Sequence, residues 1–216
     1  MPQVFNQSSN FLARLTLIGG AATAAAIALV AFMLVRSDYA TGANTPPPQP
    51  VPFSHKHHSG GDGIDCRYCH TSVEESYYAG IPPTQTCMNC HNQLWANSPN
   101  LAPVRDSWQT GQPIQWARVH DLPDFVYFNH SIHVTKGIGC STCHGDVTQM
   151  QLTWQDKPLT MTWCLDCHSQ PEKYVRPKEA VYDMAYQAPA NQIELGHRLV
   201  REYGIESKLS CSTCHR

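Results

Sequence analysis

Hydrophobic residues are unevenly distributed along the chain, and the longest uninterrupted apolar run covers residues 15–35. No charged side chain interrupts this run between Arg14 and Arg36. At a rise of 1.5 Å per residue, a helix of this length spans about 31 Å, close to the hydrocarbon thickness of a bilayer. The apolar part of a cleaved secretory signal is shorter, about 7 to 15 residues. The pattern therefore predicts an uncleaved transmembrane anchor over residues 15–36, preceded by a cytoplasmic tail over residues 1–14.

Beyond the anchor, an amphipathic helical pattern stands out over residues 191–203. Asn191 and Glu194 have the spacing of a capping box, and Gly204 is a typical stop signal. One face of this predicted helix carries Ile193, His197 and Val200. The pattern favours a core or surface role for that face.

Residues 37–52 separate the anchor from the remaining chain and form a proline-rich linker. Its prolines are concentrated after Thr45, which predicts a stiff polyproline-type spacer. Long aliphatic stretches do not occur in residues 53–216. Something other than leucine and isoleucine must therefore fill the interior of this second region.

Composition and charge narrow the possible functions. The 216 residues include 10 cysteines, 12 histidines and 16 prolines, with 15% charged residues and a formal net charge of −2. Nucleic-acid binding needs a clustered basic face, and no such cluster is present. We therefore expect no nucleic-acid partner.

All ten cysteines fall into five C-x-x-C-H units, numbered here as motifs 1 to 5 in chain order. Two thiols at this spacing bond the two vinyl-derived carbons of one haem, and the adjacent histidine reaches the iron as the proximal ligand. A zinc ribbon would not need the histidine, and five small disulfide rings would connect nothing distant. The spacing therefore predicts five c-type haems. The motifs are Cys66/Cys69/His70, Cys87/Cys90/His91, Cys140/Cys143/His144, Cys164/Cys167/His168 and Cys211/Cys214/His215.

Distal ligands are predicted from a second pattern, F-x-H-x-x-H, which occurs at residues 53–58 and again at residues 128–133. His55 precedes motif 1 and His130 precedes motif 3 by nearly the same spacing, so each is assigned to the haem of that motif. His58 and His133 are assigned to other haems of the cluster. The repeat predicts two duplicated units, about residues 53–91 and 128–168, with a fifth haem motif added at 211–215.

The fifth distal ligand remains open at this point. His120 is the first choice, because an unpaired histidine in a chain rich in metal ligands tends to be used. The alternatives are His197, Met150 and Met161, of which a methionine would raise the haem potential. His57 lies between two better placed histidines and is predicted to face solvent.

These ligands predict a fold and a function class. Haems replace the side-chain core, so residues 53–216 should form a multihaem cytochrome c domain of short helices and loops, with little or no sheet. Haem is attached after export, which places this domain on the outer, periplasmic face of the cytoplasmic membrane. Saturated irons favour electron transfer without substrate chemistry of its own. A multihaem reductase with one open iron, and a self-sufficient quinol dehydrogenase, are the alternatives.

The segment RVHDLPDFVYFNHSIHVTKGIGCSTCHG at residues 118–145, the terminal CSTCHR, the anchor and the five motifs together resemble the pentahaem subunit of bacterial alternative complex III. The resemblance covers essentially the whole chain. It implies a respiratory complex that oxidises quinols such as menaquinol, with an iron-sulfur subunit, polytopic quinone-binding subunits and a monohaem cytochrome c subunit as partners. A soluble cytochrome c, a copper protein or a terminal oxidase would accept the electrons. In such a complex this chain would be an electron-transfer subunit rather than the catalytic one.

Overall fold

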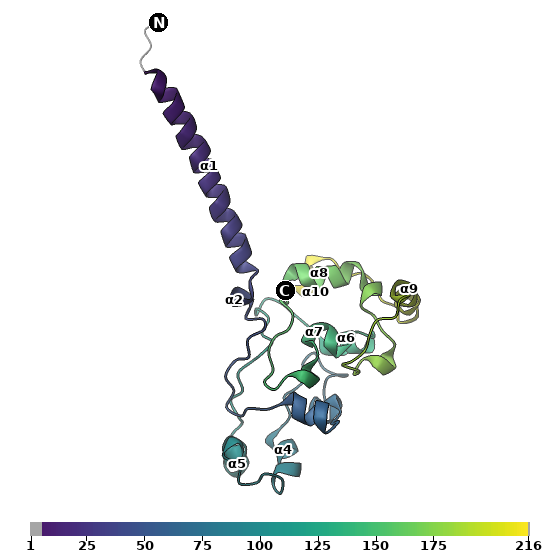
Figure 1. Ribbon diagram of the computed structural model, residues 1–216. Coiled ribbons are helices and arrows are strands. Elements are labelled where there is room, and N and C mark those ends of the chain that lie inside the picture. Colours follow the sequence, from purple (N-terminus) through teal and green to yellow (C-terminus); the bar gives the residue numbers. More distant parts are fainter. Residues whose placement is uncertain (1–5, 216) are drawn as a thin grey trace. The chain divides into compact units, whose positions relative to one another are not determined.

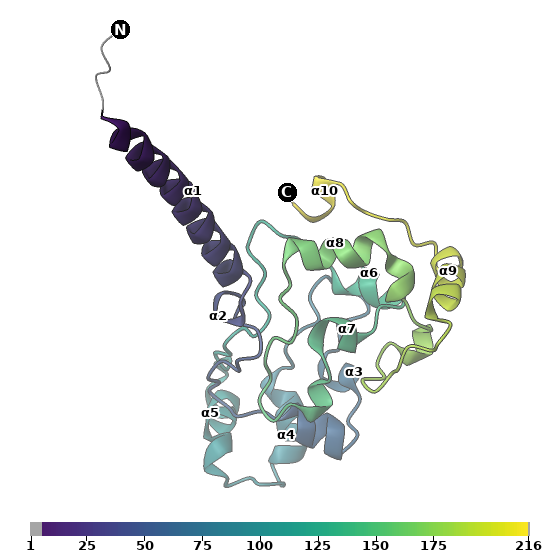
Figure 2. The ribbon, with the colours of Figure 1, turned by 45° about the horizontal axis from the view of Figure 1, so that its top comes forward.

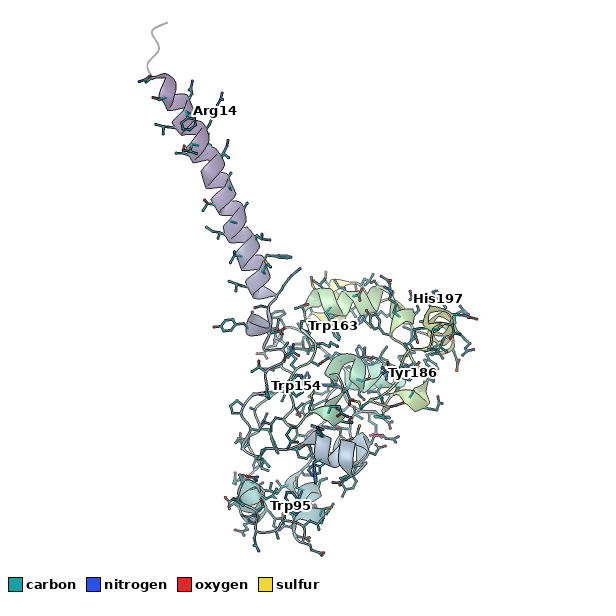
Figure 3. All side chains as sticks on the ribbon, in the orientation of Figure 1. Arg14, Trp95, Trp154, Trp163, Tyr186 and His197 are labelled. Atoms are coloured by element: carbon teal, nitrogen blue, oxygen red, sulfur yellow. The ribbon has the colours of Figure 1, made fainter. Side chains whose placement is uncertain are left out.

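The computed structural model describes residues 6–215 and divides the chain into two compact units, Met1–Gly42 and Ala43–Arg216. The first unit contains helix α1 (Gln7–Val35) and the short helix α2 (Asp38–Thr41), which ends at Gly42 in a left-handed conformation. Ser8–Val35 is long and apolar enough to cross a membrane. The helix begins earlier than the sequence pattern suggested, because Arg14 lies inside it and does not end it. Arg14 is marked on α1 in Figure 3.

The second unit consists of short helices joined by loops, and the described residues contain no strand that belongs to a sheet. Three isolated backbone bridges occur, Ala43–Gln155, Val126–His215 and Ile138–Val175. This confirms the expected fold class of helices and loops without a sheet. The α-helices are α3 (Cys66–Cys69), α4 (Thr84–His91), α5 (Ala102–Thr110), α6 (His130–Thr135), α7 (Cys140–His144), α8 (Met161–Ser169), α9 (Gln192–Glu202) and α10 (Cys211–Cys214). The other short helices are η1 (Lys56–Gly61), η2 (Pro99–Leu101), η3 (Val147–Gln149), η4 (Pro171–Lys173) and η5 (Lys178–Ala180).

The cysteines of each motif lie on a helix. Of the shortest of these helices, α7 covers just the five-residue motif, and α3 and α10 end at the second cysteine, with the histidine as the C-cap residue. Local capping starts two of the motif helices. The Asp65 carboxylate accepts a hydrogen bond from the Arg67 amide at α3, and the Thr160 hydroxyl accepts one from the Trp163 amide at α8. A single helical turn brings the first cysteine, the second cysteine and the histidine onto one side.

Helix α9 packs against η4 through its small residue Gly196 and through Leu199, both of which are buried. A Cβ atom at Gly196 would collide with the Glu172 carbonyl, so only glycine allows this close approach. Gly204 adopts the left-handed conformation expected of a stop signal. The expected capping box was wrong, because the Asn191 side chain makes no capping bond. His197 is exposed on this helix (Figure 3).

Residues 43–52 of the proline-rich linker belong to the second unit and contact it at a few positions. The Asn44 amide donates to the Gln155 carbonyl, and Val51 is buried. Gln49 exchanges two hydrogen bonds with the backbone of Ala117, at 2.8 and 3.0 Å. Long-range polar contacts of this kind were not visible in the local sequence.

The side-chain core is small. Among the described residues only eight hydrophobic side chains are buried, and many large aromatic and aliphatic side chains of the second unit are exposed. In both ribbon views α4 and α5 lie at one end of this unit, α8 and α10 lie together at the other end, and α6 and α7 lie between them (Figures 1 and 2). The motif helices are therefore distributed along the whole unit.

Candidate haem sites

The structure pairs four of the motif histidines with four histidines from the two F-x-H-x-x-H segments. Two imidazole nitrogens on opposite sides of one iron, each about 2 Å from it, place the ring centroids about 6 Å apart. All four pairs match this spacing. The centroid distances are 6.5 Å for His55–His70, 6.0 Å for His58–His91, 6.4 Å for His130–His144 and 6.0 Å for His133–His168.

The pairing is consistent with the assignment of His55 to motif 1 and His130 to motif 3. It extends that assignment, because His58 is brought to His91 of motif 2 and His133 to motif 4. Each F-x-H-x-x-H segment thus faces both motifs of its own repeat unit. Because one short turn of chain carries both histidines, this turn would link the two predicted haems of a unit.

A phenylalanine supports the two histidines of each segment in the same way. The Phe53 ring meets His55 edge-on at 4.9 Å and stacks on His58 at 4.5 Å. The corresponding distances from Phe128 are 4.8 and 4.5 Å, with the same interplanar angles of 87° and 23°. The sequence showed the phenylalanine in both copies, but its supporting role emerges only from this geometry.

Hydrogen bonds leave one nitrogen of each ring available for iron. The Nδ1 atoms of His70, His91, His168 and His215 lie within hydrogen-bond distance of backbone carbonyl oxygens. Among the distal rings, His58, His130 and His133 do the same, while His55 Nδ1 lies 2.8 Å from the Thr153 hydroxyl. Such bonds fix the tautomer and aim Nε2 at the metal.

Burial keeps the central imidazoles in the neutral form that binds metal. It lowers the pKa of His55 to about 4 and that of His144 to about 3, in each case assisted by neighbouring histidines. The neighbours of His144 include His70 and His55, so motifs 1 and 3 lie close together.

The cysteine thiols show which other motifs are neighbours. All ten are free. The pKa of Cys69 in motif 1 is raised by burial first and then by the nearby Cys87 of motif 2. The pKa of Cys140 in motif 3 is raised to about 11, mainly by burial and secondly by the nearby Cys66 of motif 1. Motif 1 is thus adjacent to both motif 2 and motif 3.

The same reasoning continues to the C-terminal motifs. The pKa of Cys143 in motif 3 is raised to about 12, mainly by burial and secondly by the nearby Cys167 and Cys164 of motif 4. Burial raises the pKa of Cys164, and Cys214 of motif 5 raises it further. The spatial order of the motifs is therefore 2, 1, 3, 4, 5, in agreement with the positions of α4, α7, α8 and α10 in Figure 2.

Two of the ten predicted attachment thiols differ from the others in exposure. Cys90 of motif 2 and Cys211 of motif 5 are exposed, whereas the other eight are partly buried. The sequence pattern does not distinguish the ten thiols, whereas in the structure α4 and α10 lie at the two ends of the unit (Figure 2). Cys90 still lies close enough to Cys69 to contribute to its raised pKa. Haem attachment at Cys90 therefore stays a prediction that depends on the motif spacing and not on burial of this thiol.

Motif 5 has no histidine facing it in the way that the other four do. His215 contacts Phe125, with ring centroids 5.7 Å apart. The phenylalanine ring cannot bind iron. His120 lies against His144 of motif 3, with its Nε2 3.2 Å from His144 Nδ1, so this placement does not support it as the fifth distal ligand.

The other candidates for the fifth ligand differ in position. His197 is exposed on α9 (Figure 3), and Met150 is buried with its carbonyl bonded to the Lys56 amide of η1. Met161 is exposed at the start of α8, the helix whose Cys164 neighbours motif 5. The identity of this ligand stays a prediction. His57 is exposed, as expected, and lies 3.6 Å from Asp62.

The residues present fit covalently attached haem better than a protein-bound ion. Among residues 6–215, no three His, Cys, Asp or Glu side chains converge as the ligands of one metal ion. The histidines instead form pairs at a separation suited to an iron between them. This arrangement fits haem c, for which each motif would supply two thioether bonds and the paired imidazoles would be the axial ligands.

Comparison with known proteins agrees with this geometry. Residues 126–216 match the family of cytochrome c7 and related cytochrome c. The chain is also 30% identical over 142 residues to the multihaem cytochrome c subunit of a menaquinone reductase from Nitratidesulfovibrio vulgaris, a match that covers 56% of this chain and 68% of the relative. The chain belongs to the multihaem cytochrome c family, whose members transfer electrons through haem c.

Proposed function

We propose that this chain is the pentahaem electron-transfer subunit of a membrane quinol-oxidising complex of the alternative complex III type. The observation that carries this proposal is the linear series of five motifs, four of which face a second histidine at iron-ligand spacing. Each bound haem c supplies one-electron exchange at its iron. The chain contributes the ligands, their orientation and the order of the sites.

With haem bound, the paired histidines of motifs 1 to 4 would occupy both axial positions of each iron and would leave no open position for a substrate. His55 and His130 hold the far side of the two central sites, and their Nδ1 bonds to Thr153 and to the Tyr77 carbonyl fix their orientation. Closed sites of this kind favour electron transfer over substrate chemistry. The multihaem reductase alternative is therefore confined to motif 5.

The order of the sites supports a relay with two ends. Motif 2, on α4, and motif 5, on α10, lie at opposite ends of the second unit (Figure 2). Each of these two motifs has an exposed thiol, Cys90 and Cys211 respectively. Each of the other motifs has a neighbour on both sides. Motifs 2 and 5 are accordingly the proposed points where electrons enter and leave.

Helix α1 supports a membrane location but contains no group suited to quinol chemistry. Oxidising a quinol releases protons, and the only ionisable side chain in Ser8–Val35 is Arg14. The quinone site is therefore proposed to lie on polytopic partner subunits, beside an iron-sulfur subunit and a monohaem cytochrome c subunit. The second unit is proposed to lie on the periplasmic face of the cytoplasmic membrane, where a soluble cytochrome c, a copper protein or a terminal oxidase accepts the electrons.

The opposite direction of electron flow is a second candidate, favoured by the relative named as a menaquinone reductase subunit. The same relay would then carry electrons from a periplasmic donor towards the quinone. Assays of the complex purified from native membranes distinguish the two, because quinol oxidation should be faster than quinone reduction under the proposed function. A preparation without polytopic partners that still oxidises quinol would instead indicate a self-sufficient dehydrogenase.

Replacement of distal ligands tests the proposal directly. In the full chain, His55→Ala and His130→Ala should each convert one low-spin haem into a high-spin haem, at motifs 1 and 3 respectively. Haem content is measured by the pyridine haemochrome, and the spin state by electron paramagnetic resonance (EPR) of the oxidised protein. His57→Ala is the matched control and should leave all signals unchanged. An unchanged spectrum in either ligand variant would contradict the pairing of that histidine with its motif. Fewer than five haems in the wild type would contradict the pentahaem assignment.

A further inference from the structure

His120 lies beside a proximal ligand. Its Nε2 is 3.2 Å from His144 Nδ1, and the two rings meet edge to face with centroids 4.3 Å apart and planes at 79°. The contact joins residues 24 positions apart in the sequence, and the local pattern gave no sign of it.

No other predicted axial ligand has such a partner. Seven of the other eight have Nδ1 within hydrogen-bond distance of a backbone carbonyl, and His55 faces the Thr153 hydroxyl. His144 alone faces an imidazole nitrogen. With its Nε2 on the iron, His144 carries its proton on Nδ1 and donates it, so His120 accepts at Nε2 and holds its own proton on Nδ1.

We propose that His120 is a positioning residue for the haem of motif 3, acting through His144. The hydrogen bond fixes the plane of the His144 ring and raises the basicity of this ligand, because a partial negative charge develops on an imidazole whose proton is shared. A more basic axial ligand stabilises ferric iron and lowers the reduction potential. The inference rests on the proposed function, since it takes His144 as an iron ligand.

The internal repeat provides a comparison within the molecule. His70 of motif 1 corresponds to His144, and its Nδ1 lies 2.7 Å from the Gly80 carbonyl. The axial rings of the two sites are otherwise alike, with planes 8° apart at motif 1 and 10° apart at motif 3. An imidazole nitrogen is a more basic acceptor than an amide oxygen, so this contact lowers the potential of motif 3 relative to motif 1.

The test uses two substitutions in the full chain, His120→Phe, which removes the acceptor, and His120→Gln, whose amide oxygen still accepts. Potentiometric titration followed by optical and EPR spectroscopy should show one of five midpoint potentials shifted upward in the phenylalanine variant. The shift should be smaller in the glutamine variant, and all haems that were low-spin should remain so. The same two substitutions at the exposed His57 serve as controls and should move no midpoint.

Each other outcome overturns the proposal in a recognisable way. A new high-spin haem in the His120 variants would identify His120 as an axial ligand. Unchanged midpoints would make it a bystander, and loss of one haem in both variants would show that His120 is needed for attachment and not for tuning. Failure of the proposed function is distinguishable, because it would appear in the wild type as a haem count below five.

Discussion

The orientation of individual axial rings divides the four paired sites into two classes. The ring planes are nearly parallel at His55–His70 and His130–His144, with angles of 8° and 10°. They are strongly crossed at motifs 2 and 4, with angles of 67° and 63°. The two repeat units give the same result independently, which indicates that the segment geometry sets the angle.

We therefore predict two types of low-spin EPR signal in the oxidised protein. Parallel axial rings split the iron orbitals that carry the unpaired electron and give rhombic spectra, whereas crossed rings leave these orbitals nearly degenerate and give a signal with one very large g value. Two haems of each type are expected at liquid-helium temperature, apart from motif 5. A spectrum with a single type from the four paired sites would contradict these ring orientations.

Arg176 is a buried cation beside motif 3 without an acidic partner at ion-pair distance among residues 6–215. Its side chain is 6% exposed, donates to the hydroxyls of Ser141 and Thr142, and stacks on Tyr186 at 4.4 Å. A Cβ at Gly139 would collide with the guanidinium, so the glycine makes room for it. No local sequence pattern distinguishes this arginine from the others.

A positive charge near an iron favours the reduced state, which carries one positive charge less. Arg176→Met should therefore lower the midpoint potential of motif 3, opposite to the shift expected for His120→Phe. The lost hydrogen bonds should also reduce the free energy of unfolding by about 1–3 kcal/mol. Arg176→Lys keeps the charge and should keep the midpoint. Equal midpoints in wild type and methionine variant would show that the charge does not reach the iron.

At the scale of elements, the two F-x-H-x-x-H segments lie on different helices and still place their rings alike. His130 begins the α-helix α6, whereas His55 precedes the π-helix η1. The distance from the first histidine to the motif is 11 residues in the first unit and 10 in the second. A π-helix accommodates one extra residue per turn, so η1 absorbs the insertion without moving the histidines.

Deletion of Gly61 should therefore be tolerated. It removes the extra residue, converts η1 into an α-helical turn, and should leave five haems with the wild-type EPR spectrum. Deletion of Gly137 in the second unit is the control, because that unit has no residue to spare and Gly137 packs with φ of 78° against Arg176. It should lose the haem of motif 3, as measured by intact mass. Loss of a haem from the Gly61 deletion would contradict this account of η1.

Local sequence signals predicted the motif helices, the helix ending before Gly204 and the absence of a sheet, because each depends on spacing or on one turn of chain. They did not predict η1, because a π-helix differs from an α-helix by only one extra residue in the turn. The packing of η1 on η3 offsets the free-energy cost of inserting that residue. The partners of His120 and Gln49 were also missed, because they lie 24 and 68 positions away. The exposure of Cys90 was not visible either, since identical motifs do not reveal which one lies at an end of the unit. The internal repeat was the one long-range signal that the sequence carried.

At the scale of the whole molecule, the division into units falls at Gly42, earlier than the start of the haem domain predicted at residue 53. Residues 43–52 belong with the second unit through Val51 and through the paired hydrogen bonds of Gln49 to Ala117. The anchor and the haem domain can therefore be separated cleanly only before Ala43. A cut at residue 53 removes part of the domain itself.

Two truncated chains, each exported behind a cleavable signal, test this boundary. The chain that begins at Ala43 should be soluble, carry five haems and keep the wild-type midpoint potentials, because the second unit keeps all its internal contacts. The chain that begins at Phe53 loses the burial of Val51, the two hydrogen bonds of Gln49 and the bond from the Asn44 amide to the Gln155 carbonyl. Together these losses should lower the free energy of unfolding by about 3 kcal/mol. Denaturant unfolding followed by circular dichroism measures the difference. Equal stability of the two chains would mean that the proline-rich segment is a spacer that does not stabilise the domain. If only the chain that begins at Ala43 aggregates, residues 43–52 need the membrane or a partner to cover them.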